Sequence, residues 1–232
     1  LLSKKTKENK SDSNPIKKGI GKVKSRKDTK YISVNPIQTG YAAIADEWLG
    51  IRPGTDGLFV GALIAELLKS EQIDWEFLTR YTNSPWLVID DPGSAKHGLF
   101  ARDEAEKSLC YDLEKAAVTE LIVGKSKPAL IGSFKLSDGT KAVPAFQHIV
   151  EEFLGDGYEL TKVEKETGIK AIDIERIAAE MAEVAFSEEI IIDQKWTDSY
   201  GNEHDQFIGR PVSFHAMRGI AAHKNGFETC RM

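Results

Sequence analysis

Thr55 and Asp56 are the residues whose positions suggest chemistry most directly. They follow Arg52-Pro53-Gly54, where proline stops a strand ladder and glycine lets the backbone turn. Thr55 is a good helix N-cap, and a carboxylate in a first helical turn complements the helix dipole. Such a carboxylate can also accept two parallel hydrogen bonds from a planar N–H and NH2 edge, such as that of guanine. Spacing alone leaves capping, the commoner use, and ligand binding both open.

A second group of polar residues gathers near the C-terminus, between Trp196 and Gly226. It holds three of the five histidines, and its members with binding chemistry are Arg218, Gly219, His223 and Asn225. Arginine supplies a bidentate fork and glycine permits close backbone approach, which suits a phosphate or another anion. A polar loop with satisfied histidines explains the same residues equally well. The histidines are spaced too irregularly for two on one helical turn, so we expect no zinc site.

The two cysteines, Cys110 and Cys230, are too few for a disulfide framework. Neither has a cysteine or histidine at metal-ligand spacing, so we expect a reducing compartment and no structural zinc. Because no neighbouring base is evident, Cys110 is expected to be a partly buried thiol rather than a nucleophile.

Two strand-turn-helix units must position Thr55 and Asp56. Residues 46–51 predict a short strand, and the almost wholly apolar residues 58–68 predict a buried helix whose N-terminus faces a crevice. Just upstream, residues 31–34 predict a strand that Asn35-Pro36 stops, with a helical patch over residues 41–45. This is the rhythm of parallel α/β proteins, in which such turns share one edge of the sheet and bind ligands there.

The rest of the chain predicts elements that surround this unit. Asp74 should cap a helix over residues 75–81, followed by a strand over 85–90, helices over 145–154, 160–167 and 172–184, and a buried strand over 189–193. Residues 94–141 are poorly periodic and predict a surface excursion with one strand pair, near residues 130–136, that turns at 138–139. The last two helices resemble a helix-turn-helix, but their exposed Glu and Asp would repel DNA, so packing helices are favoured.

Residues 1–30 are rich in lysine and poor in apolar side chains, which predicts a flexible basic arm or loop. Such an arm can bind nucleic acid or an anionic membrane, but without interleaved aromatics a solvated linker is favoured. The 232 residues carry a net charge of -5 and have an ordinary globular composition. No apolar run approaches the roughly 18 residues of a membrane span, and the start lacks the centre of a secretion signal. Because the chain starts with Leu, we expect a fragment or a processed product.

Three stretches resemble the molybdopterin-dependent oxidoreductases of the dimethyl sulfoxide reductase family. They are Ile32-Ser33-Val34-Asn35-Pro36-Ile37-Gln38-Thr39, Ala45-Asp46 through Ile51-Arg52-Pro53-Gly54-Thr55-Asp56, and Met217-Arg218-Gly219 through His223-Lys224-Asn225-Gly226. The second is the family's most recognisable internal signature, and the outer two support it. The resemblance runs from about Lys30 to the end of the chain. The segment from Trp196 to Arg231 looks most like a sulfite dehydrogenase-type catalytic subunit, neighbour to polysulfide and thiosulfate reductases.

The resemblance implies a doubly wound, mostly parallel sheet with helices on both faces (α/β/α), part of a larger multidomain enzyme and incomplete at both ends. Residues 31–232 would then bind a bis(molybdopterin guanine dinucleotide) that carries molybdenum or tungsten. Asp56 would take the guanine edge. The other implied cofactor-binding residues are Asn35, Pro36 and Gln38 at the first strand's exit, Arg52, Gly54 and Thr55 around the guanine pocket, and Arg218, Gly219, His223 and Asn225 toward the pterin or the substrate funnel.

The sequence departs from the family pattern at two levels. Asn35 stands where an Asp is usual, and Gln38 stands close to where an Arg is common, so neither brings the usual charge. The metal ligand and the cysteines of a 4Fe-4S cluster would lie upstream of the first stretch, and a further cofactor-binding domain downstream of the third. We therefore assign no metal ligand and no catalytic residue in this chain, and expect it not to turn over alone.

Our main hypothesis is a segment of a molybdenum oxidoreductase that acts on a small, sulfur-containing oxyanion. Implied partners are an iron-sulfur electron-transfer subunit, together with a membrane-anchor subunit, without nucleic acid or direct membrane insertion, and the implied location is cytoplasmic. The first alternative is a non-catalytic remnant or stand-alone binding module. The second is an ordinary nucleotide-binding α/β domain, which the absence of GxGxxG and Walker motifs disfavours.

Overall fold

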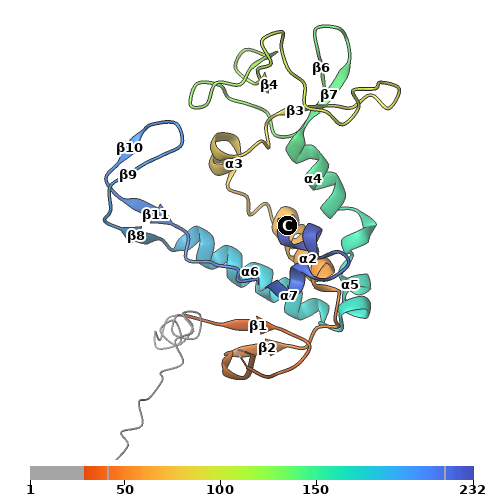
Figure 1. The fold of residues 1–232 in the computed structure, drawn as a ribbon, viewed down its shortest axis with the longest axis vertical. Helices are drawn as coiled ribbons and strands as arrows, with labels where there is room; N and C mark the ends of the chain where they lie inside the picture. The colour runs from red at the N-terminus through yellow and green to blue at the C-terminus, as the bar shows by residue number, and fades with distance from the viewer. Residues whose placement is uncertain (1–28, 41, 217) are drawn as a thin grey trace, which may run out of the picture.

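Helices and short strands are mixed along the chain, as the predicted α/β class requires (Figure 1). The computed structural model describes residues 29–40, 42–216 and 218–232. The basic arm predicted over residues 1–30 therefore lies outside the described residues, except for its last two positions. In the described part, no helix is both long and apolar enough to cross a membrane.

The first strand-turn-helix unit begins with β1 (Ile32–Val34), followed by the short 3-10 helix η1 (Ala42–Ile44) and β2 (Glu47–Leu49). β1 and β2 pair in parallel, with Ser33 opposite Trp48. The backbone N–H of Asn35 donates to the Leu49 carbonyl at 3.1 Å, so the two strands end side by side. The parallel start predicted for this region is confirmed.

Helix α2 (Asp56–Lys69) is the centre of the larger hydrophobic core. It packs against α5 (Leu160–Thr167) and α6 (Ala171–Ser187). The buried residues that it shares with these helices are Phe59, Ala62, Leu63, Val163, Ile174 and Ile177. No residue between 57 and 68 is fully exposed, so the prediction of a buried helix is confirmed. Gly168 ends α5 in the left-handed conformation, at a φ of 81°.

A second group of elements surrounds a smaller core of Leu87, Ile89, Ala101 and Ala142. The antiparallel sheet has the order β3 (Leu87–Ile89), β7 (Lys141–Pro144) and β6 (Phe134–Lys135), and β4 (Leu109–Asp112) pairs with β5 (Ala117–Glu120). α3 (Trp75–Tyr81) and α4 (Ala145–Phe153) lie between this lobe and α2 (Figure 1), and η2 (Asp156–Tyr158) contacts α2, α4 and α5. The strand pair expected around residues 130–136, with a turn at 138–139, is observed as β6 and β7, and the pair of β4 and β5 was not expected.

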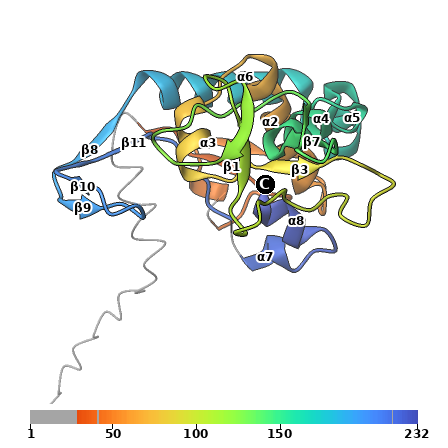
Figure 2. The same ribbon diagram turned by 90° about the horizontal axis from the view of Figure 1, so that it is seen from above.

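The C-terminal part leaves α6 as a long ribbon and returns to α2. β8 (Ile190–Ile192) pairs antiparallel with β11 (Phe207–Gly209), and β9 (Trp196–Thr197) pairs with β10 (Glu203–His204) at the tip. Two short helices follow, α7 (Arg218–Ala221) and α8 (Gly226–Arg231). Figure 2 shows the ribbon projecting from α6 while α7 and α8 lie back against the body.

Two expectations about the strands need correction. Residues 189–193 were predicted to form a buried strand, but Ile190, Ile191 and Ile192 are 45%, 55% and 47% exposed, and β8 is paired with a single strand, β11, among the described residues. Among the described strands only β1 and β2 pair in parallel, and the other sheets are antiparallel. These strands alone do not form the expected doubly wound sheet.

Candidate functional site

The turn between β2 and α2 holds Gly54 in the left-handed region, with a φ of +83°, which glycine adopts without a steric penalty. Thr55 occupies the N-cap position, but its hydroxyl donates backward to the Arg52 carbonyl at 2.8 Å and does not cap a helical N–H. The expected side-chain cap is therefore wrong. The backbone of Thr55, with a ψ of 10°, lies outside the extended conformation that N-cap residues typically adopt.

Arg52 fixes this turn to the end of α5. Its Nη1 atom donates to the carbonyls of Lys165 at 2.8 Å and Glu166 at 2.9 Å, and its backbone N–H donates to Thr167 at 2.8 Å. A guanidinium at a helix C-terminus satisfies carbonyls that lack partners and complements the dipole. The Nη1 atom of Arg52 is thus engaged in holding the frame of the site.

Asp56 is the first residue of α2, and its side chain is half-buried. Within the described residues, its carboxylate takes part in no hydrogen bond and no ion pair. Because Asp56 is partly exposed, both carboxylate oxygens can accept hydrogen bonds from water or from a ligand. The carboxylate is not covered by its own fold.

Helix α8 closes over the start of α2 from the other end of the sequence. A Cβ atom on Gly57 would lie 2.8 Å from Thr229 Oγ1 and 3.6 Å from Asn225 Nδ2, so only glycine permits this approach. The turn between α7 and α8 is equally tight, because a Cβ on Gly226 would lie 1.9 Å from the Ile220 carbonyl oxygen. Two close contacts at glycine therefore fix the residue 223–226 turn beside the N-terminus of α2.

The turn at Gly54 and residues 223–228 border an open hollow of about 600 Å³. Its lining residues are Gly54, His223, Lys224, Asn225 and Glu228. Small-molecule sites commonly have volumes of 300–1,000 Å³ and a few convergent polar groups. The hollow offers an imidazole, an ammonium, an amide and a carboxylate beside a glycine without a side chain. Such a set can hold a polar, anionic ligand with hydrogen-bonding edges.

Of the residues predicted for cofactor binding, Gly54, His223 and Asn225 line this hollow, whereas Arg52, Thr55 and Asp56 belong to the same turn as Gly54 but are not in the lining. Asn35, Pro36 and Gln38 are exposed beyond the end of β1, and the Asn35 side chain accepts a hydrogen bond from the Ile37 N–H at 3.2 Å. Gly219 is exposed on α7. Arg218 begins α7, but its side chain lies outside the described part of the chain.

Lys224 and Glu228 line the hollow but were not among the predicted residues. Lys224 lies inside the family-like stretch, so its position between His223 and Asn225 was a usable signal. Glu228 lies in the first turn of a short helix, and nothing in its local pattern distinguishes it from an ordinary solvated glutamate. Only the packing of α8 on α2 places it in the hollow.

Elsewhere in the described chain, the Cys110 thiol and the Asp198 carboxyl have structural roles. No group of three or more His, Cys, Asp or Glu residues in the described part could hold a metal ion. Cys110 is fully buried, and burial raises the pKa of its thiol, which keeps it neutral. Hydrogen bonds from Asn202 and His204 hold the pKa of the Asp198 carboxyl far below its ordinary value, and they organise the β9–β10 turn.

Comparison of the sequence with known proteins identifies the family of this chain. No family profile matches the chain. It is 42% identical over 228 residues to a sulfite dehydrogenase subunit of Allochromatium vinosum, in an alignment that covers 94% of this chain and 23% of that protein. It is 36% identical over 85 residues to the major subunit of the nitrate-inducible formate dehydrogenase of Escherichia coli, covering 37% of this chain and 8% of that protein.

A third relative is the putative dimethyl sulfoxide reductase catalytic subunit of Halobacterium salinarum. The identity is 28% over 156 residues, which cover 66% of this chain and 18% of that protein. The chain thus spans less than a quarter of the length of these relatives. The long match to one relative and the shorter matches to two others support the resemblance identified in the sequence. This chain belongs to the molybdopterin-dependent oxidoreductases of the dimethyl sulfoxide reductase family.

Proposed function

We propose that this chain is a segment of the catalytic subunit of a molybdenum oxidoreductase and that it grips a guanine dinucleotide end of a bis(molybdopterin guanine dinucleotide). One observation carries the proposal: Gly54 and residues 223–228, far apart in sequence, meet at one hollow, and Asp56, two residues after Gly54, has a carboxylate with no partner among the described residues. Both segments belong to stretches that resemble the family's cofactor-binding sequences.

The residues at the hollow fit such a group. The two Asp56 oxygens match the N–H and NH2 edge of guanine, and Gly54 leaves room for a planar base. Lys224 and the Asn225 amide supply donors for phosphate or ribose oxygens, and His223 completes this side of the hollow. Arg52 holds the turn in place, with Thr55. Asn35, Pro36 and Gln38 are exposed near the strand end for nucleotide contact, while Arg218 and Gly219 would approach the pterin.

The bound cofactor would supply the redox chemistry through its molybdenum or tungsten atom. The residues of this chain would bind the dinucleotide and orient it, because no described group is placed as a metal ligand. The relative named as a sulfite dehydrogenase supports a small sulfur oxyanion as substrate, and cationic Lys224 would favour an anion in this region.

The whole protein would extend beyond this chain. We propose that β1 and β2 begin a doubly wound parallel sheet, with helices on both faces, which further polypeptide completes. The 4Fe-4S ligands would lie in that further polypeptide. An iron-sulfur electron-transfer subunit, with or without a membrane anchor, would accept or deliver electrons in the cytoplasm.

The proposal is tested by isolating the full-length protein with its cofactor. Acid-released GMP and bound molybdenum are measured per polypeptide, in wild type, in Asp56→Ala and in Asp138→Ala, a control in the distant β6–β7 turn. We expect Asp56→Ala to lower GMP at least about tenfold, because two hydrogen bonds to a charged group are lost, and the control to retain it. Full GMP in Asp56→Ala would contradict the assignment. Wild type without GMP or metal would favour the non-catalytic alternative.

A further inference from the structure

Trp48 reaches from β2 to the end of β1, where the residues proposed for nucleotide contact begin. Its indole Nε1–H donates to the backbone carbonyl of Asn35 at 2.8 Å. The ring lies over Gly50, where a Cβ atom would be 3.1 Å from two ring carbons, so glycine leaves the space that the indole needs. Water could satisfy the N–H of a side chain that is 37% exposed. The consequence of this bond therefore lies at Asn35, whose carbonyl it holds.

Asn35 is fixed at three of its polar groups. Trp48 holds its carbonyl, its backbone N–H donates to the Leu49 carbonyl at 3.1 Å, and its side-chain Oδ1 accepts from the Ile37 N–H at 3.2 Å. Because a backbone N–H can only donate, the side-chain atom that it meets is the oxygen, which settles the orientation of the amide. The remaining polar group of Asn35 is Nδ2, which has no hydrogen-bond partner among the described residues and belongs to an exposed side chain.

This geometry makes Asn35 a hydrogen-bond donor toward a ligand. An ionised aspartate, the residue that the family pattern predicts here, can only accept, whereas Nδ2 carries two N–H groups. The ribose and phosphate oxygens of a nucleotide are acceptors. A residue that is already held at three points loses little conformational freedom on binding, and such preorganisation strengthens the contact.

We propose that Trp48 is a positioning residue, which holds the Asn35 carbonyl so that the Asn35 amide donates to a ribose or phosphate oxygen of the nucleotide. This inference rests on the proposed function, because it needs a nucleotide at the ends of β1 and β2. β2 leads directly into the turn at Gly54, which lines the hollow together with His223 (the Gly54–His223 hollow). Asp56 and Asn35 would then contact different parts of the nucleotide, the base and an oxygen beyond it.

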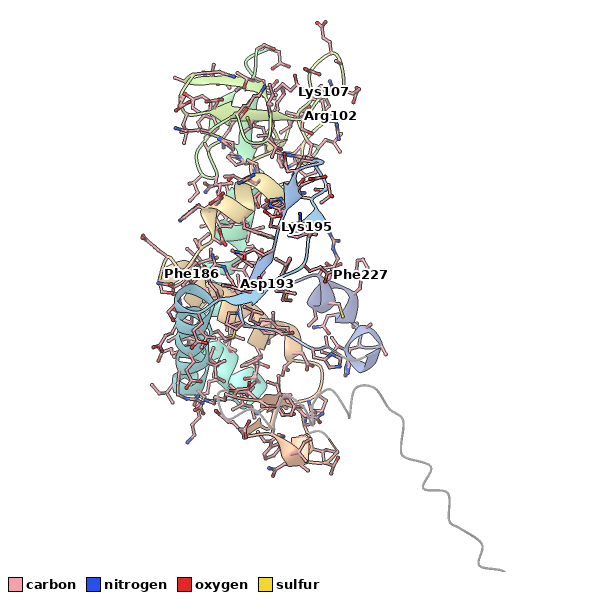
Figure 3. The ribbon with its side chains drawn as sticks, turned by 90° about the vertical axis from the view of Figure 1, so that its left-hand side faces the viewer. Arg102, Lys107, Phe186, Asp193, Lys195 and Phe227 are labelled. Carbon is pink, nitrogen blue, oxygen red and sulfur yellow. The ribbon has the colours of Figure 1, made fainter. Side chains whose placement is uncertain are left out.

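Nucleotide binding by the cofactor-free full-length protein tests the role of Trp48. Trp48→Phe keeps an aromatic ring but removes the N–H donor. Trp196→Phe is the matched control, because Trp196 is 36% exposed and its Nε1–H donates to the Gln206 carbonyl at 3.0 Å. Figure 3 shows Lys195, the residue before it, on the ribbon of β8 to β11, whereas β1 and β2 lie at the lower end of the molecule. We expect Trp48→Phe to weaken GMP binding about 3- to 10-fold, and the control to leave it unchanged.

A double-mutant cycle separates positioning from a general structural effect. Asn35→Ala removes the side-chain amide but keeps the backbone carbonyl. In this background Trp48→Phe should have no further effect on GMP affinity, because Trp48 acts through the Asn35 amide. An equal loss of affinity with and without the Asn35 amide would overturn the proposal.

Asn35→Asp tests the donor character of the amide. Aspartate keeps an oxygen for the Ile37 N–H but offers no donor, so GMP should bind at least about threefold more weakly. Equal or tighter binding would overturn the donor assignment. With guanosine in place of GMP, a penalty that disappears assigns the accepting oxygen to the phosphate, and a penalty that persists assigns it to the ribose; both support the proposal.

The same assay distinguishes this inference from the proposed function. A wild-type protein that does not bind GMP would overturn the proposed function, and this inference with it. GMP binding by the wild type that Trp48→Phe leaves intact would overturn this inference alone.

Discussion

At the scale of single residues, the site depends on glycines as much as on polar groups. Gly57 and Gly226 allow α8 to lie against the start of α2, and Gly54 turns the chain before Asp56. Without these contacts, His223 and Asn225 would have no fixed relation to Asp56. Glycine in the sequence indicates close backbone approach in general, but only the structure shows which glycines are indispensable.

Substitutions at Gly226 and Gly219 form a matched pair that tests whether close contacts at glycine are needed. A Cβ on Gly226 would lie 1.9 Å from a backbone oxygen, which cannot move aside easily, whereas a Cβ on Gly219 has no atom within 4 Å. We expect Gly226→Ala to destabilise the protein by about 3 kcal/mol through forced backbone shifts. Gly219→Ala should leave stability unchanged or raise it by up to about 1 kcal/mol, since Ala favours helix. Urea unfolding measures both, and equal midpoints would refute the tight-turn account.

At the scale of elements, the sequence located the helices well. α3 and α5 have the predicted bounds, and Asp74 caps α3 by accepting from the Phe77 N–H at 2.9 Å. Local capping and periodicity determine these features, so the sequence carries them. Strand pairing was harder to predict, because β4 and β5 join through contacts that their own pattern does not specify. The exposure of β8 was not predicted either, because an uninterrupted isoleucine run is typical of a buried strand.

An ion network ties β2 to α6 and gives an expected pH dependence. Burial alone would raise the pKa of Glu47, but hydrogen bonds from Arg176 and Lys30 outweigh it and hold that pKa below its ordinary value of 4.5. A lowered carboxyl pKa means that this stabilisation is complete above pH 4.5 and is lost as the pH falls through the lower, folded-state pKa.

The variant Glu47→Gln should therefore be less stable than wild type by about 1 kcal/mol at pH 7, a modest value because the pair is partly exposed. The difference should shrink as the pH falls from about 4.5 toward 2. Urea midpoints measured across that range, with exposed Glu104→Gln as the control, check both statements. A difference between Glu47→Gln and wild type that stays constant with pH would contradict the ionic origin.

At the scale of the whole molecule, the chain has two cores, one around α2 and one around β3 and β7. The Gly54–His223 hollow lies beside the start of α2, the helix at the centre of the first core. The sequence predicted the convergence of the Asp56 and His223 stretches only through family resemblance, because no local pattern links residues so far apart. It could not predict Glu228 in the lining, because the position of Glu228 depends on how α8 packs on α2.

Guanine selectivity tests the central claim most directly. IMP lacks the 2-amino group of GMP, so it can donate only one of the two hydrogen bonds that the Asp56 carboxylate is proposed to accept. In cofactor-free full-length protein, we expect GMP to bind about 10- to 100-fold more tightly than IMP. Asp56→Asn should remove that preference, while Asp138→Asn should keep it. Equal binding of GMP and IMP by the wild type, or an unchanged preference in Asp56→Asn, would contradict the account.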